Sequence, residues 1–175
     1  MKYIDSLGIK IQMRKVLDFG CGVGRLSQAL ANYFEEVHGV DIAPSMIELA
    51  NKYNHFRDKC KYYLNDSGDL SLFGDDVFDF IYTNITLQHI EPQYSKNYLK
   101  EFLRVLKSGG LLIFQLPSQP LSGTSIKKVW ISDTFPMIEM HYIPKEEVVK
   151  LIHENGGKIV DIERELRHYR HHFKG

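Results

Sequence analysis

The chain has 175 residues, the length of one domain, and its 22 Lys and Arg residues balance its 22 Asp and Glu residues. With 43% hydrophobic residues and no excess of basic charge, it has the composition of a globular protein without a general electrostatic attraction for nucleic acid. We expect no signal peptide, because the first residues, MKYIDSLGIKIQ, are charged and polar where its apolar run would lie. We expect no membrane span, because no apolar run approaches about 20 residues. Two cysteines argue against a disulfide framework, so the expected location is the cytoplasm.

Short apolar runs alternate with segments of helical periodicity along most of the chain. The runs predict five strands, at residues 15–19, 36–40, 60–64, 77–83 and 111–116.

Helices are predicted between these strands. The first follows Gly24, the second begins at Pro44, where a proline costs no hydrogen bond, and the third begins near Pro92. Gly109 and its neighbour are expected to end the third helix in a left-handed cap. A last helix is predicted over residues 144–155.

The end of the chain predicts a change of pattern. Residues 158–165 alternate apolar and charged side chains, which predicts a strand with one solvated face, and residues 166–173 are its expected hairpin partner. Together these elements predict an α/β fold. It is a Rossmann-like, doubly wound and mostly parallel sheet of about seven strands, with helices on both faces and a C-terminal antiparallel hairpin.

The first predicted strand runs into a glycine loop, at the place where a doubly wound sheet binds its ligand. Gly20, Gly22 and Gly24 lie two residues apart, and glycine permits a tight turn and the close approach of a ligand. Asp41 ends the second strand, 21 residues after Gly20. This spacing suits a carboxylate that accepts hydrogen bonds from both hydroxyls of a ribose.

A dinucleotide-binding fold is the nearest alternative. Its G-x-G-x-x-G pattern would place the third glycine at position 25, which is Arg25 here. Asp18 lies two residues before Gly20, where its charge would repel a pyrophosphate and attract an ammonium group. A nicotinamide-dependent oxidoreductase therefore remains an alternative, while the acid favours a ligand that carries an ammonium group.

The segments VLDFGCGVGR and VHGVDIAPSMIELA resemble the class I S-adenosylmethionine-dependent methyltransferases, in particular their small-molecule branch. The resemblance continues through NDSGDLSLFGDDVFDFIYTNITLQHI and LKEFLRVLKSGGLLIFQLP, and it covers the last helix and hairpin loosely. It implies a single methyltransferase domain over residues 1–175, with a cofactor-binding part at about 15–117. It also implies S-adenosylmethionine as the cofactor and S-adenosylhomocysteine as its product.

The same resemblance implies where the methionine and ribose parts of the cofactor bind. Asp18 and the backbone of Gly20, Gly22 and Gly24 match the residues that hold the methionine end. Asp41 matches the ribose-binding acid.

Further positions match residues around the adenine and the amino acid part. Ile42 and Met46 match positions that pack on the adenine ring. Asp66 and Ser67 match the loop in which a carboxylate takes the adenine amino group and a backbone N–H meets the ring. Asn84, after the fourth strand, matches a position beside the cofactor's amino acid portion.

Two of these assignments have alternatives. Met46 can be an ordinary residue of the helix core. Asp66 can be a turn residue, because Asp favours turns, and Asp69 is a rival for the adenine amino group.

The resemblance implies in-line transfer of a methyl group to an O or N atom of a small-molecule acceptor. His89 is the candidate general base, because it follows the fourth strand and its side chain titrates near neutral pH. The family commonly carries a pattern like LQHI with different acceptors, which favours a structural role for this histidine. Glu91 is a weaker alternative, and His141 and Tyr142 can line the acceptor pocket or simply pack.

Several other chemistries are disfavoured. DNA amino-methylation requires an Asn/Asp-Pro-Pro-aromatic motif, whereas residues 84–87 read NITL. Neither Cys21 nor Cys60 follows a proline, as cytosine C5 methylation requires. We expect no metal site, because no acidic cluster is evident and the histidines of residues 168–172 are typical of a surface strand. The expected partners are a small-molecule acceptor and at most a second copy, with no nucleic acid and no membrane.

Residues 118–143 interrupt the strand–helix rhythm, and so long a connection is usually functional or mobile. Only 14 residues precede the first strand, where many relatives carry helices over the acceptor pocket. We therefore expect either that this segment, with Trp130, Phe135 and Met140, acts as a lid or acceptor segment, or that the pocket is open, which would suit a bulky acceptor or a partner subunit. A non-catalytic cofactor-binding module is the remaining alternative.

Overall fold

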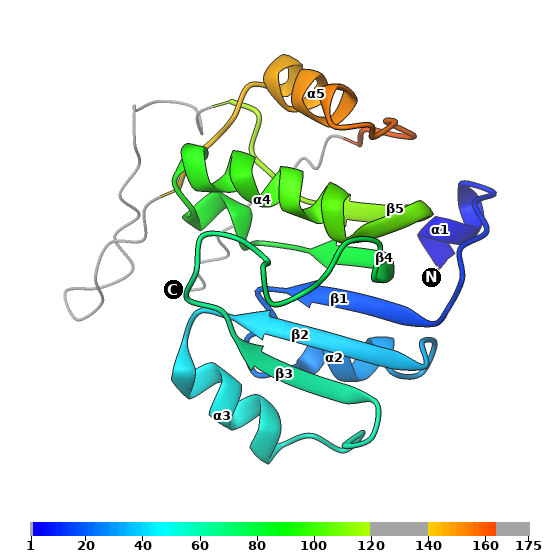
Figure 1. Cartoon of the computed structure of the whole chain (residues 1–175), viewed down its shortest axis with the longest axis vertical. Helices are drawn as coiled ribbons and strands as arrows, with labels where there is room; N and C mark the ends of the chain where they lie inside the picture. The colour runs from blue at the N-terminus through cyan, green and yellow to red at the C-terminus, as the bar shows by residue number, and fades with distance from the viewer. Residues whose placement is uncertain (1, 120–139, 164–175) are drawn as a thin grey trace, which may run out of the picture.

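The computed structural model describes residues 2–119 and 140–163. Five parallel strands form one sheet in the order β3-β2-β1-β4-β5 (Figure 1). The strands are β1 (Lys15–Phe19), β2 (Glu36–Asp41), β3 (Cys60–Leu64), β4 (Phe78–Thr83) and β5 (Leu106–Phe114).

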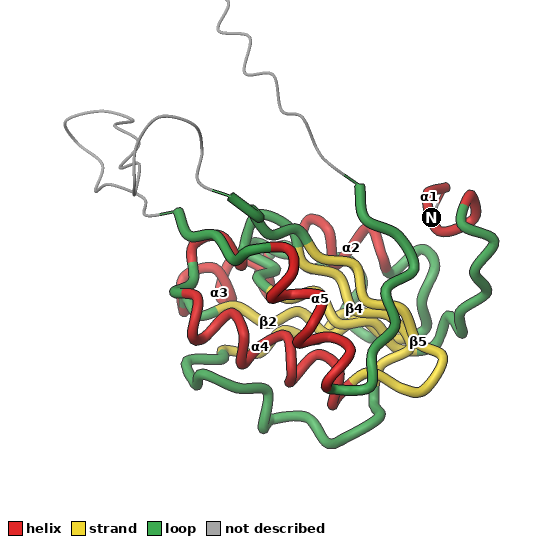
Figure 2. Tube along the Cα trace, turned by 90° about the horizontal axis from the view of Figure 1, so that it is seen from above, coloured by secondary structure: helices red, strands yellow, loops and turns green. Residues whose placement is uncertain are grey.

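Helices connect the strands and cover the sheet. They are α1 (Lys2–Ser6), α2 (Arg25–Leu30), α3 (Pro44–Lys52), the short 3-10 helix η1 (Leu87–His89), α4 (Pro92–Val105) and α5 (Lys145–Glu154). Seen from above, α4 and α5 lie on one side of the sheet and α2 on the other (Figure 2). No helix in the described ranges is long and apolar enough to cross a membrane.

Neighbouring side chains of β1 enter two different cores, because successive residues of a strand point to opposite faces. Val16 packs in a cluster with Ile4 of α1 and Phe34, and each of the three is at most 3% exposed. Leu17 packs in the other cluster with Phe102 of α4, and both are fully buried. The central strands are therefore buried on both faces, as a parallel sheet requires.

The α/β class and the parallel sheet that the sequence predicts are confirmed, and β1 and β3 have the predicted bounds. The sheet of the described residues has five strands rather than about seven. Residues 158–163 form no strand, because no described strand pairs with them, and 164–173 lie outside the described residues. The C-terminal hairpin is therefore not confirmed.

The helix before β5 ends at Val105 rather than at the predicted Gly109 cap. Leu106 is extended (φ −81°, ψ 129°) and already pairs with Phe78, so pairing in the sheet replaces the next helical turn. The register of β4 and β5 then shifts, and Gly109 takes its left-handed φ of +77° in this irregular part of the strand. Gly109 thus lies in an irregular part of the strand rather than in a helix cap.

A buried carboxylate joins the beginnings of three strands. Asp79 of β4 is 3% exposed, and its Oδ1 lies 2.9 Å from Nζ of Lys107. Its Oδ2 accepts a 2.8 Å hydrogen bond from the backbone N–H of Lys15, where β1 begins. Both carboxylate oxygens therefore have partners, which makes the burial of this charge tolerable.

We expect Asp79→Ala to lower the free energy of unfolding by about 2 kcal/mol, since a charged hydrogen bond and a buried backbone donor lose their partner. The loss stays below that of a fully buried ion pair because Lys107 is 33% exposed and can be hydrated. Urea denaturation measures the change. The control is Glu154→Ala, which removes an exposed pair with Lys150 and should cost less than about 0.5 kcal/mol. Equal losses in both variants would contradict a special role for Asp79.

Candidate functional site

The glycine loop after β1 folds back onto β2. The backbone N–H groups of Gly20 and Cys21 both donate to the carbonyl of Val40, at 2.9 and 3.0 Å. Gly22 has a left-handed φ of +53°, and no atom lies within 4 Å of the place where its Cβ would be. The backbone at this position therefore faces open space and can be approached closely by a ligand.

The other two glycines of the loop are required by their neighbours. Gly20 and Gly24 both have left-handed φ values, +75° and +78°. A Cβ on Gly20 would collide with the side chain of Thr86, and one on Gly24 would collide with the ring of Tyr62. Gly24 also directly precedes α2, so the third glycine is needed at position 24 and not at Arg25.

Asp41 joins the end of β2 to this loop. Its Oδ2 accepts a hydrogen bond from the N–H of Gly22, and its Oδ1 accepts one from the N–H of Ala43, both at 2.9 Å. The residue is half-buried, and each carboxylate oxygen keeps capacity for a further donor. This geometry suits a carboxylate that takes two adjacent hydroxyl groups.

Asp18 is buried beneath the same loop. It is 2% exposed, and its Oδ2 accepts a 2.6 Å hydrogen bond from the hydroxyl of Ser27 in α2. Burial raises the pKa of Asp18 to about 6, Ser27 opposes the shift, and the nearby charge of Asp41 adds to it. Among the described residues Asp18 has no cationic partner, so a ligand's ammonium group would favour its ionised form.

Apolar side chains lie uncovered beyond the end of β2. Ile42 is 70% exposed and Met46 is 38% exposed, whereas Ala50 is the buried residue of α3. Met46 is therefore not part of the helix core. Exposed aliphatic groups beside Asp41 can pack against a flat ring.

The loop after β3 separates two candidate acids. Asp69 accepts hydrogen bonds at Oδ1 from the N–H of Ser71 and the hydroxyl of Ser67, at 3.0 and 3.1 Å, and the bond from Ser71 is the main cause of its lowered pKa. Asp66 is exposed and makes no hydrogen bond with the described residues. Asp66 therefore keeps its whole carboxylate available to a ligand, whereas Oδ1 of Asp69 is occupied by the loop itself.

The segment after β4 forms the opposite rim. Asn84 is exposed, and the next residue, Ile85, has a left-handed φ of +61°, which is unusual for a β-branched side chain. His89 is exposed, and its Nε2 lies 3.0 Å from Nε2 of Gln88. The carbonyl of Gln88 accepts a 2.7 Å hydrogen bond from the N–H of His141.

The structure thus brings His141 to the rim that carries His89, while the neighbouring Tyr142 is 43% exposed. Met140 is half-buried, whereas Trp130 and Phe135 lie in residues 120–139, outside the described part. The expected lid over residues 118–143 consequently stays a prediction.

Three contributors to this site have no signal in the local sequence. Thr86 fills the space beside Gly20 and donates to the carbonyl of Phe19 at 3.4 Å. Tyr62 fills the space beside Gly24, and Ser27 holds Asp18. Each contact joins separate elements, so only the folded chain brings the partners together.

Comparison with known proteins identifies the family of this chain. The family described as "Methyltransferase domain" matches residues 17–114. A ubiquinone biosynthesis O-methyltransferase of Coxiella burnetii is 34% identical over 171 residues, covering 93% of this chain and 70% of that protein. A sterol 4-C-methyltransferase of Caenorhabditis elegans is 37% identical over 100 residues, covering 55% of this chain and 29% of that protein.

Solved structures share the fold. A methyltransferase from Methanosarcina mazei superposes with a TM-score of 0.70 at 23% identity, covering 89% of this chain and 84% of that one. The chain belongs to the class I S-adenosylmethionine-dependent methyltransferases, and it is an enzyme with S-adenosylmethionine as its cofactor. The enzyme class and the cofactor that the sequence predicts are confirmed.

The residues at the ends of the strands fit this cofactor. The backbone of Gly22 faces open space, the oxygens of Asp41 can accept further donors, and Ile42 offers an uncovered apolar surface. Within residues 2–119 and 140–163, no three metal-ligating side chains come together. The histidines of the C-terminal tail lie outside the described residues.

We expect Asp18→Asn to raise the free energy of unfolding near pH 7 by on the order of 2–3 kcal/mol, because the variant buries no charge. The pKa of Asp18 is raised on folding, from 3.8 to about 6, so the wild type loses stability as pH rises through this window. The difference between the two proteins should therefore vanish below about pH 4. Urea denaturation across this pH range measures it.

The same variant has a second readout. S-Adenosylhomocysteine should stabilise the wild type more than Asp18→Asn, since only the wild type offers a carboxylate to the ligand's ammonium group. A stability difference that does not change with pH would contradict the titration of Asp18 in this range.

We expect Asp66→Ala to weaken the binding of S-adenosylhomocysteine about 10-fold while leaving the free energy of unfolding within about 0.5 kcal/mol of wild type. The matched variant Asp69→Ala should instead lower the free energy of unfolding, because Ser71 and Ser67 lose their acceptor. Calorimetric titration and urea denaturation of both variants give the two quantities. The reverse ranking would assign the adenine amino group to Asp69.

Proposed function

We propose that this chain is a single-domain methyltransferase that transfers the methyl group of S-adenosylmethionine to an O or N atom of a small-molecule acceptor. The observation that carries the proposal is the Asp41 carboxylate, which anchors the glycine loop at Gly22 and keeps acceptor capacity toward open space. The names of the two relatives, one acting in ubiquinone biosynthesis and one on a sterol, support a small organic acceptor.

The proposed cofactor contacts follow the carboxyl ends of the strands. Asp18 and the backbone of Gly20, Gly22 and Gly24 take the methionine end, and Asp41 takes the ribose hydroxyls. The hydrogen bond from Ser27 holds the carboxylate of Asp18 beneath the loop.

The remaining contacts concern the adenine and the amino acid part. Ile42 and Met46 pack on the adenine, Asp66 accepts its amino group and the N–H of Ser67 meets the ring. Asn84 lies beside the amino acid portion, at the end of β4. The exposure of Ile42, Met46 and Asp66 supports these roles.

The bound cofactor supplies a methyl group that is already activated by a sulfonium. The chain therefore has to align the acceptor with this group and exclude water, and alignment alone can contribute on the order of 7–11 kcal/mol. The rim formed by Asn84, Ile85 and the helix η1 is the proposed place of the acceptor. The unusual backbone of Ile85 there is in keeping with strain at a functional site.

His89 is the proposed general base for an acceptor that must lose a proton. Its exposed ring lies on this rim, next to the segment that carries His141. A structural role for His89 is the alternative. The variant His89→Gln separates these two roles. If His89 is the general base, its removal lowers kcat and leaves the dissociation constant of S-adenosylhomocysteine unchanged.

The experiment that tests the proposal is calorimetric titration with S-adenosylhomocysteine, with NADH as the comparison ligand. We expect binding of the first alone, and a loss of about 10- to 100-fold in Asp41→Ala, because a charged acceptor of ribose hydroxyls and of the Gly22 N–H is removed. The control is Glu36→Gln, which neutralises a carboxylate at the other end of β2.

Unchanged binding in Asp41→Ala would overturn the placement of the cofactor. Methyl transfer is then assayed with a set of hydroxyl and amine acceptors. Transfer to one of them supports the proposed reaction, and tight cofactor binding without transfer to any acceptor would support a non-catalytic module. Product that carries the methyl group on carbon would contradict the assignment to O or N.

A further inference from the structure

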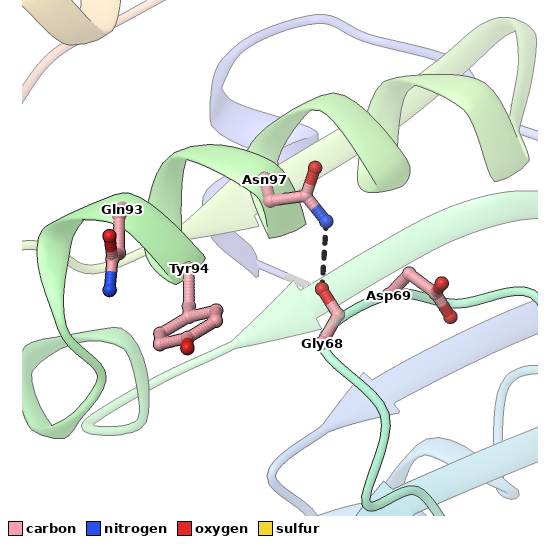
Figure 3. Close-up of a pocket in the computed structure, with 5 residues that line it drawn as sticks. All are labelled: Gly68, Asp69, Gln93, Tyr94 and Asn97. Carbon is pink, nitrogen blue, oxygen red and sulfur yellow. Dashed lines mark hydrogen bonds between the residues drawn. The ribbon is translucent and has the colours of Figure 1, made fainter.

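The loop between β3 and β4 is held by side chains of one helix, α4. The hydroxyl of Tyr98 donates a 2.6 Å hydrogen bond to the carbonyl of Ser67. The amide of Asn97 donates a 2.7 Å hydrogen bond to the carbonyl of Gly68 (Figure 3). The carbonyls of the two residues that follow Asp66 are therefore held by neighbouring residues of α4.

The second half of the same loop, residues 70–75, is held by more hydrogen bonds. Glu101 accepts a hydrogen bond from the N–H of Leu70 at 2.9 Å and binds Arg104 through both of its oxygens. Arg104 also donates to the carbonyls of Leu70 and Phe73 and pairs with Asp75. This end of the loop is fixed independently of the two bonds from Tyr98 and Asn97.

The first half of the loop, residues 66–68, has little packing to hold it. Asp66, Ser67 and Gly68 are all exposed. A hollow of about 440 Å³ lies between Gly68 and the first turns of α4, lined by the residues drawn in Figure 3. The residues on its lining are Gly68, Asp69, Gln93, Tyr94 and Asn97. Hydrogen bonds rather than apolar contacts therefore set the position of this part of the loop.

Tyr98 is well suited to fix the position of the loop after β3 relative to the core. Its side chain is 6% exposed, and its ring packs on Phe19 with a centroid distance of 4.6 Å and on Phe102 at 6.2 Å. The ring is thus locked in the core while the hydroxyl reaches the loop, a use of the apolar body and polar tip of tyrosine.

We propose that Tyr98 and Asn97 are positioning residues that place Asp66 and the N–H of Ser67 against the adenine, and so determine the selectivity of the enzyme for this base. The inference rests on the proposed roles of Asp66 and Ser67 in the cofactor site. Neither Tyr98 nor Asn97 touches the cofactor in this arrangement.

The base that tests selectivity is hypoxanthine. Adenine offers an amino donor and a ring-nitrogen acceptor, which match a carboxylate and a backbone N–H. Hypoxanthine offers a carbonyl oxygen and a ring N–H at the same positions, so both contacts become repulsive. S-Inosylhomocysteine should therefore bind the wild type at least about 100-fold more weakly than S-adenosylhomocysteine.

The experiment measures both dissociation constants by calorimetry for the wild type, Tyr98→Phe, Asn97→Ala and the double variant. We expect the ratio of the two constants to fall about 5- to 10-fold in the double variant, because the loop no longer holds its donor and acceptor in place. Tyr98→Phe keeps the buried ring. Asn97 is exposed, so Asn97→Ala alone is a test that does not threaten folding.

The matched control is Tyr3→Phe, which removes a tyrosine hydroxyl from a 2.9 Å hydrogen bond to Asp161 and should leave the ratio unchanged. A purely structural role of α4 would weaken both ligands equally, and an unchanged ratio in the double variant would overturn the inference. If the wild type itself does not distinguish the two bases, the proposed roles of Asp66 and Ser67 fail, and the inference fails with them.

Discussion

The carboxylate of Asp41 is the interaction on which the site depends. It accepts the N–H of Gly22 across two adjacent strands and the N–H of Ala43 within its own turn. The parallel pairing of β1 and β2 brings these groups together, because it aligns the carboxyl ends of both strands at one edge. The glycine loop can therefore adopt its open conformation at Gly22 before any ligand is present, and little ordering remains to be done on binding.

Asp18 shows the cost of such preorganisation. A carboxylate that is 2% exposed and has a hydroxyl but no described cation as its partner opposes folding whenever it is ionised. A ligand that brings an ammonium group would supply the missing positive charge, so the same residue that weakens the free protein would strengthen the proposed complex. The protein would be more stable with a neutral residue here and a poorer receptor for the proposed methionine end.

Local pattern was sufficient for the elements that carry the site. The alternation of apolar runs and helical segments predicted the parallel sheet, and the spacing of Gly20, Gly22, Gly24 and Asp41 predicted their meeting at one edge, because these features repeat within a few residues. The local sequence pattern gave the wrong role for Gly109, because strand pairing competes with the helix there. Gly109 belongs to a bulge because Leu106 pairs with β4.

The contacts between residues far apart in the sequence could not be predicted, for another reason. Tyr62 is 38 residues from Gly24, Thr86 is 67 from Phe19 and Tyr98 is 31 from Ser67. In each case the residue type is common in a core or a helix, and nothing in the neighbouring sequence distinguishes the one that supports the site. The contribution of such residues depends on strand order and on helix packing, which a single sequence does not display.

The helix α4 links the two halves of the site through one side chain. The ring of Tyr98 packs against Phe19, the last residue of β1 before the glycine loop, while its hydroxyl holds Ser67 in the loop after β3. A displacement of α4 would therefore disturb both the support of the glycine loop and the loop beside Asp66. Since Lys96 of α4 also pairs with Glu147 of α5, the packing of α5 bears on the same support. The two loops proposed to meet opposite ends of the cofactor thus contact the same buried tyrosine, so the packing of α4 would influence both parts of the proposed site.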